Sequence, residues 1–158
     1  MDVEIRKATL NDLKKVQELN LLLFEKEHED YDSLLNLNWT FGEEGTKYFT
    51  DKIVQNDACV FVSEVDNRII GYLCGDIRKE VSYRHLPFVA ELDNMMVIDE
   101  FRSSGIGSKL YEKFIQWCKS KNIGKIRVNV SAENKQGINF YKKNGFKEYS
   151  LILETDLK

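Results

Sequence analysis

The chain has 158 residues, of which 42% are apolar and 31% charged, and its net charge is −3 with a pI of about 5.5. This balance predicts one soluble globular domain over residues 1–158 and excludes a generally basic surface that would attract nucleic acid by charge alone. Cys59, Cys74 and Cys118 have unrelated spacings, which favours neither a disulfide framework nor a CxxC site, so we expect a reducing, cytoplasmic location. Neither a signal peptide nor an apolar run of membrane-spanning length is present, so we expect no membrane partner.

The first half of the chain predicts a strand, several helices and a hairpin. Residues 3–7 alternate like a strand, and Thr9 with Asp12 has the spacing of a capping arrangement that opens a helix. From 25 to 44 the pattern weakens into an acidic and aromatic stretch, where we expect a short helix or two, and a further helix follows at about 46–55. Residues 58–78, with Asp66 and Asn67 as the turn pair, predict a two-stranded hairpin.

The second half alternates strands and helices. A strand is predicted over 90–97, followed by a loop and an amphipathic helix whose apolar residues recur at helical spacing: Ile106, Leu110, Phe114, Trp117 and Cys118. A strand at 125–130, a helix at 134–144 closed by Gly145, and a terminal strand or pair from 146 onward complete the order. The element order predicts one α/β domain with a mixed sheet.

Two glycines, Gly105 and Gly107, lie where the amphipathic helix begins, although glycine is a poor helix former. The first turn of a helix presents free N–H groups and the positive end of the helix dipole, and glycine lets a bulky anion approach them. The plainer alternative is that Ser103 or Ser104 caps the helix and the glycines ease a turn.

Two nucleotide-binding motifs do not fit this loop. A dinucleotide fingerprint needs a third glycine where Leu110 stands, and residues 107–109 have the wrong order for a P-loop. The segment instead resembles the signature [RQ]xxGx[GA] of the GNAT superfamily of acyl-CoA-dependent N-acetyltransferases, with Arg102, Gly105 and Gly107 in the required places.

A second segment, NKQGINFYKKNGF, resembles the NxxxxxFYxxxGF stretch of the same family through Asn134, Phe140, Tyr141, Gly145 and Phe146. The element order also agrees over the whole chain. The resemblance implies a mixed α+β fold, in which a mostly antiparallel sheet of six or seven strands splays at the cofactor site and about four helices flank it.

The resemblance also implies acetyl-CoA as the acyl donor, with no metal. Amides of the glycine loop would hold the pyrophosphate, the backbone of one strand end would pair with the pantetheine arm, Asn134 would bind the pantetheine region, and Tyr141 would lie near the sulfur. The residues so assigned to the cofactor are Met95, Met96, Val97, Arg102, Ser103, Ser104, Gly105, Ile106, Gly107, Ser108, Asn134 and Tyr141.

Acetyl transfer to an amine requires a neutral nitrogen, a stabilised oxyanion and a proton for the departing thiolate. Glu91, eleven residues before Arg102, is the first choice of base because some family members place a glutamate there, and Asp93 should share its strand face. A base position on the following strand in other relatives is occupied here by Asn129, which cannot titrate. Tyr141 is the expected acid. The alternatives are that the carboxylates edge a solvated strand and that the tyrosine is a core aromatic.

We therefore expect an N-acetyltransferase that moves acetyl from acetyl-CoA to a primary amine within a ternary complex. A small cationic amine is favoured over a protein amine because the first third of the chain is acidic and aromatic, and a homodimer is allowed by the family resemblance. The rival interpretation is a non-catalytic acyl-CoA-binding sensor or interaction module on the same fold.

Overall fold

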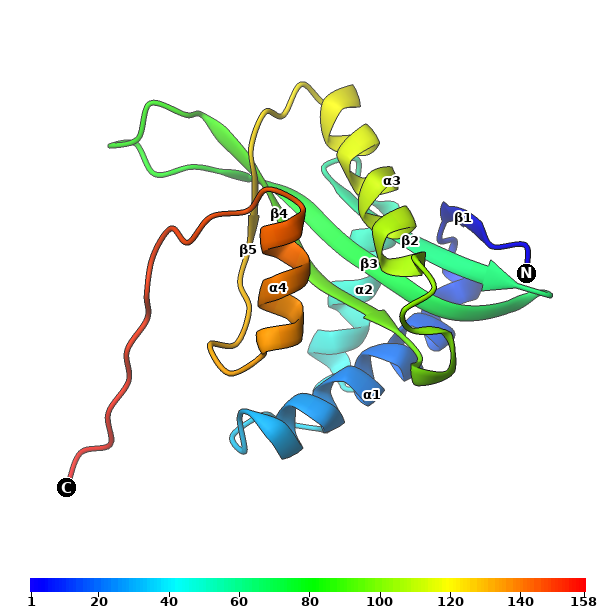
Figure 1. Ribbon diagram of the computed structural model, residues 1–158, viewed down its shortest axis with the longest axis horizontal. Helices are drawn as coiled ribbons and strands as arrows, with labels where there is room; N and C mark the ends of the chain where they lie inside the picture. Colours follow the sequence, from blue (N-terminus) through cyan, green and yellow to red (C-terminus); the bar gives the residue numbers. More distant parts are fainter.

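A computed structural model describes residues 1–158 as a five-stranded sheet covered by helices on both faces (Figure 1). The elements in chain order are β1 (Glu4–Lys7), a 3-10 turn (Leu10–Asp12), α1 (Leu13–Asp30), α2 (Glu43–Val54), β2 (Ala58–Val65), β3 (Arg68–Lys79), β4 (Phe88–Val97), a second 3-10 turn (Asp99–Phe101), α3 (Ile106–Ser120), β5 (Ile126–Val128) and α4 (Lys135–Lys143).

The strands lie in the order β1-β2-β3-β4-β5, and every neighbouring pair is antiparallel except β4 and β5. The mixed, mostly antiparallel sheet and its four flanking α-helices are as predicted. The predicted hairpin is also present: Asp66 and Asn67 have φ of 50° and 63°, the left-handed conformation that the tight turn between β2 and β3 requires.

The strand count differs from the six or seven expected. Residues from 146 onward form no strand, and 147–158 run as extended chain away from the body (Figure 1). The predicted strand at 125–130 is shortened to Ile126–Val128. A segment with strand-like alternation forms a strand only where it can hydrogen-bond to the edge of a sheet. Residues 147–158 do not lie along such an edge.

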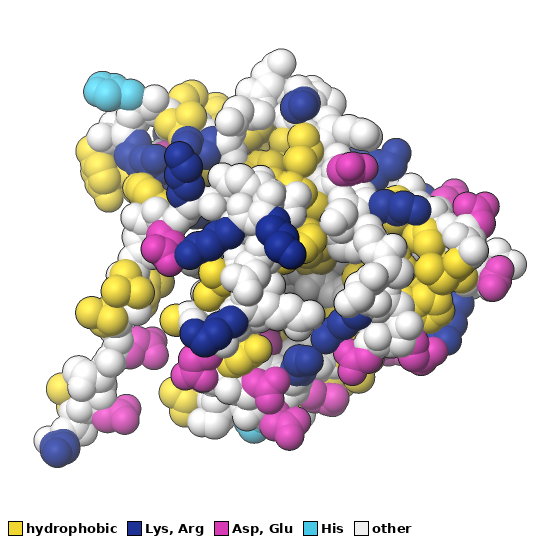
Figure 2. Space-filling model, viewed as in Figure 1, with side chains coloured by type: hydrophobic (Ala, Val, Ile, Leu, Met, Phe, Trp, Pro, Cys, Tyr) yellow, Lys and Arg dark blue, Asp and Glu magenta, His cyan; other side chains and the backbone are white.

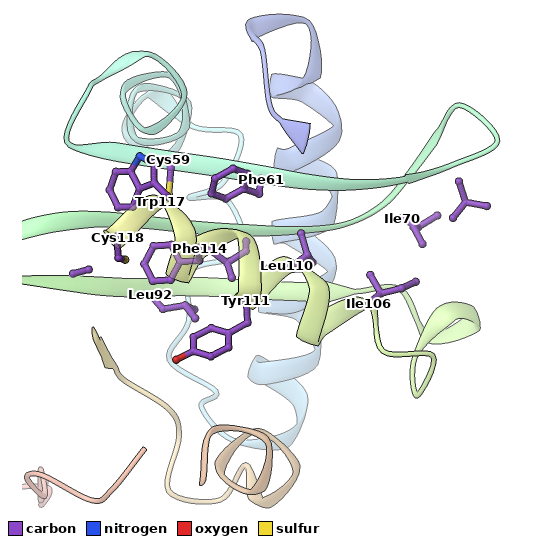
Figure 3. Packing of buried hydrophobic residues seen from close by; sticks show 13 residues of the cluster. Cys59, Phe61, Ile70, Leu92, Ile106, Leu110, Tyr111, Phe114, Trp117 and Cys118 are labelled. Atoms are coloured by element: carbon purple, nitrogen blue, oxygen red, sulfur yellow. The ribbon is translucent and has the colours of Figure 1, made fainter. Parts of the chain in front are cut away.

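The core is divided by the sheet into two clusters. The larger one packs α3 against β2, β3 and β4, and Figure 3 shows Leu110, Phe114 and Trp117 reaching from the helix toward strand residues such as Phe61 and Leu92. The second cluster fills the opposite face beneath α1 and α2 around the fully buried Phe49. The two clusters fix the sheet between the helices, and with it the strand ends that carry the predicted site.

Gly45, in the first turn of α2, tests how tightly this second face is packed. A Cβ there would lie 2.2 Å from the carbonyl oxygen of Trp39 and 2.5 Å from that of Thr40, both backbone atoms that cannot rotate away. We expect Gly45→Ala to lower the free energy of unfolding by about 3 kcal/mol in urea denaturation. Gly124→Ala is the matched control, because its Cβ would meet nothing within 4 Å, and its effect should stay near 0.5 kcal/mol or below. Equal stability of the two variants would contradict the packing described for α2.

Candidate active site

The sheet opens along β4. The pairing of β4 with β5 ends at Leu92 and Val128, whereas β4 continues to Val97. On its other side, Cys74 of β3 faces Asn94 and Gly75 faces Leu92, so Asp93 is the extra residue of a β-bulge. The predicted pantetheine-binding residues Met95, Met96 and Val97 lie beyond the bulge. This stretch of β4 therefore has a partner strand on one side only, and its other backbone edge is free to pair with an extended ligand.

The glycine loop follows directly from this strand end. Gly105 has φ of 81° and precedes α3, and Ser103 has φ of 60°. The N–H groups of residues 103–105 donate no backbone hydrogen bond, and those of residues 106–108 form the first turn of α3, where no intrahelical acceptor exists. The loop thus presents consecutive unpaired amides at the positive end of a helix.

Arg102 supports this loop instead of pointing away from it. Its Nε donates to the carbonyl oxygen of Val97 at 2.8 Å, and its guanidinium pairs with Asp99 at 3.0 Å. The side chain of Ser104 donates to the carbonyl oxygen of Phe101. These contacts tie the loop to the end of β4 and fix the position of its amides.

Asn134 and Tyr141 lie on α4. The Oδ1 of Asn134 accepts from the N–H of Gly137 at 2.9 Å, which caps the helix and leaves the amide nitrogen without a hydrogen-bond partner in the chain. The ring of Tyr141 lies edge-on to Phe140 and Phe146, each at a centroid distance of 5.4 Å. Burial, and then the charge of Glu27 on α1, raise the pKa of Tyr141 to about 12. The phenol is therefore fully protonated at neutral pH.

Asp93 is held by three donors on both of its carboxylate oxygens. The hydroxyl of Tyr48 donates to Oδ2 at 2.6 Å and Lys52 Nζ lies 3.2 Å from the same atom, while Arg78 donates to Oδ1 at 2.6 Å. Lys52 also pairs with Asp76 of β3. A carboxylate so fully engaged is suited to holding its neighbours in place.

Glu91 is less constrained than Asp93. Its side chain is 8% exposed, with Arg78 at 3.4 Å and Arg127 of β5 at 4.0 Å, both beyond hydrogen-bond length. Burial raises the pKa of Glu91 above its usual value, although the charge of Arg78 opposes the shift. Glu91 therefore has the environment of a carboxylate that can take up a proton.

The donors around these carboxylates are the part of the site that the sequence did not reveal. Lys52, Arg78 and Arg127 come from α2, β3 and β5, and no spacing along the chain links them to β4. Tyr48 of α2 lies in the acidic and aromatic first third of the chain, and nothing in its spacing indicates that it would reach Asp93. A register prediction for the β3–β4 pair would have placed Asp76 opposite Glu91 and so indicated a need for cations there.

Lys52 should contribute strongly to stability. Lys52 is only 8% exposed. Burial alone would lower the pKa of its amine, but the neighbouring carboxylates of Asp76 and Asp93 outweigh burial and raise it. Lys52→Met would leave Asp76 and Asp93 with the half-exposed Arg78 as the one cation between them, and we expect the free energy of unfolding to fall by about 3 kcal/mol. Lys47→Met is the matched control on the same helix, since its pair with Asp51 is 75% exposed on the lysine side and should be worth about 0.5 kcal/mol. Chemical denaturation of both variants checks the difference, and equal losses would contradict it.

The surface around the open strand is unevenly charged. The space-filling view shows a hollow between α4 and the start of α3, with acidic side chains gathered below it over α1 (Figure 2). Glu27 of α1 is close enough to raise the pKa of Tyr141, and burial raises the pKa of Glu27 itself. The other acidic residues in the last turns of α1 are Glu25, Glu29 and Asp30.

Comparison with known proteins agrees with this fold. The family profile described as acetyltransferase (GNAT) family matches residues 14–146. An N-alpha-acetyltransferase of Sulfurisphaera tokodaii is 26% identical over 156 residues, which cover 96% of this chain and 84% of the relative.

Two solved structures show the same fold. A predicted acetyltransferase from Clostridium acetobutylicum, solved with acetyl-CoA, has a TM-score of 0.80 and 23% identity and covers 98% of this chain and 96% of its own. The aminoglycoside N-acetyltransferase AAC(6')-Iy, in complex with a bisubstrate analogue of CoA, has a TM-score of 0.76 and 16% identity. The match covers 100% of this chain and 99% of that protein.

An open strand end that leads into a loop of bare amides, on a mixed sheet between two helical layers, defines an acyl-CoA-dependent transferase. The chain belongs to the acetyltransferase (GNAT) family and is an N-acetyltransferase. None of its helices has the length and apolar character needed to span a bilayer.

Proposed function

We propose that the chain transfers the acetyl group of acetyl-CoA directly to a primary amine within a ternary complex. The observation that carries this proposal is the continuity of the free β4 edge beyond Leu92 with the unpaired amides of residues 103–108. An extended pantetheine arm on the strand edge and a pyrophosphate on the amides would together place the thioester where the sheet opens. Acetyl-CoA is the only cofactor that the proposal needs.

Within this site Glu91 is the proposed base, Tyr141 the proposed acid and Asp93 the partner of Glu91. Glu91 has a raised pKa, and Asp93 would act mainly by holding Arg78, which both carboxylates contact. The protonated phenol of Tyr141 would donate to the departing sulfur.

Direct transfer is preferred to an acyl-cysteine intermediate because the three cysteines are buried thiols. Burial raises the pKa of all three, that of Cys118 to about 12, so the thiolate that would attack a thioester is scarce. Unpaired buried thiols also agree with the proposed cytoplasmic location.

A small cationic amine is the first candidate for the acceptor. The acidic last turns of α1, below the hollow in Figure 2, would attract a cation, and the aminoglycoside acetyltransferase shares the fold. The second candidate is a protein α-amine, because the relative from Sulfurisphaera tokodaii is an N-alpha-acetyltransferase. A lysine-like amine costs roughly 4 to 5 kcal/mol to neutralise at pH 7, and an α-amine only about 1 kcal/mol.

The deciding experiment measures free thiol released from acetyl-CoA in the presence of polyamines, aminoglycosides, amino acids and peptides with free N-termini. Release of CoA that depends on one amine class, with the acetylated amine found by mass spectrometry, supports the proposal and selects the acceptor. Tight binding of acetyl-CoA without turnover on any amine would favour the non-catalytic sensor instead.

Gly105 offers a direct test of the proposed pyrophosphate site. A Cβ at this position would meet no protein atom within 4 Å, but it would stand among the unpaired amides in a left-handed backbone conformation. We expect Gly105→Ala to raise the Kd for CoA roughly tenfold or more in calorimetric titration. Gly145→Ala is the matched control, since Gly145 has φ of 91° and equally open surroundings, and should leave the Kd within about threefold. Similar affinities in both variants would remove the loop from the cofactor site.

A further inference from the structure

Arg78 of β3 is the cation that three carboxylates of the β3–β4 pair share. Its Nε donates to Oδ1 of Asp76 at 2.9 Å and its Nη2 to Oδ1 of Asp93 at 2.6 Å, while its Nη1 lies 3.4 Å from Oε2 of Glu91. Each nitrogen of the guanidinium therefore faces a different acid. The strand register explains the arrangement, because Asp76 is directly opposite Glu91 and Arg78 follows two residues later on the same face of β3.

The two short contacts hold the guanidinium away from Glu91. The distances of 2.6 and 2.9 Å to the aspartates are those of hydrogen bonds, whereas 3.4 Å to Glu91 is longer than an ordinary N–H···O bond. A guanidinium is a rigid planar fork, so two fixed nitrogens also fix the third. Arg78 therefore acts on Glu91 through its charge and does not donate a hydrogen bond to it.

No other cation takes the place of Arg78 beside Glu91. Arg127 of β5 lies farther away, at 4.0 Å from the same carboxylate oxygen, and it also pairs with Glu80. Lys52 of α2 pairs with the two aspartates and not with Glu91. The buried side chain of Glu91 thus has a positive charge nearby but accepts no hydrogen bond from a cation.

The surroundings of Glu91 act in opposite directions on its ionisation. Burial favours the neutral acid, as do the negative charges of Asp93 and Asp76, and the result is a raised pKa of Glu91. The positive charge of Arg78 opposes this rise more strongly than that of Arg127 does. A general base must be ionised, yet proton uptake is easier when it breaks no hydrogen bond of the carboxylate. A guanidinium that is near but not bonded meets both requirements.

We propose that Arg78 is a positioning residue that keeps Glu91 ionised, because Asp76 and Asp93 fix its guanidinium where it attracts the carboxylate without occupying it. The inference rests on the proposed function, in which Glu91 accepts the proton of the amine. The side chain of Arg78 is 44% exposed, so its two hydrogen bonds to the aspartates decide whether it stays beside Glu91. The aspartates thereby act on the base without touching the substrate.

The test follows the ionisation of Glu91 itself, by carbon-13 NMR titration of its side-chain carboxyl, with the resonance assigned from its absence in Glu91→Gln. Arg78→Gln removes a positive charge and favours the neutral acid, so the midpoint should move to roughly tenfold lower proton concentration. Asp76→Asn should move the midpoint the opposite way, to roughly threefold higher proton concentration. A negative charge is lost in that variant, and the guanidinium is released to approach Glu91.

Two further variants separate the position of the charge from its mere presence. Arg68→Gln removes a positive charge from the other end of β3, where Arg68 is 56% exposed and lies 3.7 Å from Glu100, and it should leave the midpoint within about twofold. Arg78→Lys keeps a charge at the original place and should bring the midpoint back to within about threefold of the parent. An unchanged midpoint in Arg78→Gln, or shifts in the same direction in Arg78→Gln and Asp76→Asn, would overturn the inference.

The reaction is measured separately, so that the inference and the proposed function can fail independently. If Glu91 is the base, the acidic limb of the kcat/KM profile should move with the NMR midpoint in each variant. Midpoints that shift as expected while the profile stays in place would mean that Arg78 controls the ionisation of Glu91 but that Glu91 is not the base. In that case the proposed mechanism would be wrong, and the inference about Arg78 would stand.

Discussion

Replacing Tyr141 by phenylalanine should lower kcat by roughly 10² to 10⁴ while the KM for acetyl-CoA stays nearly unchanged. The substitution removes only the hydroxyl, and the edge-on contacts of the ring with Phe140 and Phe146 remain. Because the pKa of this phenol is about 12, the hydroxyl carries its proton at every pH where the enzyme would be assayed. A group that holds a proton beside a developing thiolate contributes to the transition state and hardly at all to binding, so the loss should appear in kcat.

Tyr111→Phe is the matched control for this effect. Tyr111 is 6% exposed on α3, and its ring lies 6.3 Å from that of Phe140, so it belongs to the same aromatic cluster. Its hydroxyl has no proposed role, and its loss should change kcat by less than about threefold. Steady-state kinetics on the preferred amine measure both variants. If Tyr141→Phe retained the full rate, Tyr141 would be a core aromatic and another group would protonate the sulfur.

The sequence was sufficient for those parts of the fold that depend on local pattern. The turn at Asp66-Asn67, the amphipathic helix from Ile106 and the capped helix that starts after Asn134 each follow from a few neighbouring residues. The number of strands did not follow in this way. Residues 147–158 alternate like a strand but form none, because a strand also needs a hydrogen-bonding edge, and alternation alone does not show whether the segment lies along one.

The site shows the same division between local and distant information. The loop of residues 102–108 was predicted from one short motif, and its free amides follow from the geometry of a helix start. Glu91 and Asp93 of β4 were also predicted as candidate site residues, but the sequence did not predict that their surroundings differ. A β-bulge at Asp93 and cations from three other elements decide that Asp93 is held on both oxygens while Glu91 is not. The register of β3 and β4 could have indicated a need for cations beside Glu91, but nothing in a single sequence says which residues of α2 or β5 supply them.

Replacing Glu91 by glutamine should lower kcat/KM by roughly 10² to 10⁴ for an acceptor that is a cation at neutral pH. The base must be ionised to accept a proton from the amine. Burial raises the pKa of Glu91, so activity should fall as the pH drops through that raised value, and this acidic limb should be lost in Glu91→Gln. An acceptor with a low amine pKa depends less on a base, so the same variant should lose less activity on an α-amine than on a lysine-like amine.

Glu80→Gln is the control that distinguishes the loss of a base from the loss of an ion-pair partner of Arg127. Glu80 pairs with Arg127, which also lies near Glu91, so both substitutions remove a negative charge beside the same guanidinium. If Glu91 takes the proton, Glu80→Gln should keep kcat/KM within about fivefold and retain the acidic limb of the pH profile. Equal losses in the two variants would mean that Glu91 acts by positioning Arg127, and an unaltered pH profile in Glu91→Gln would assign the base to a different group.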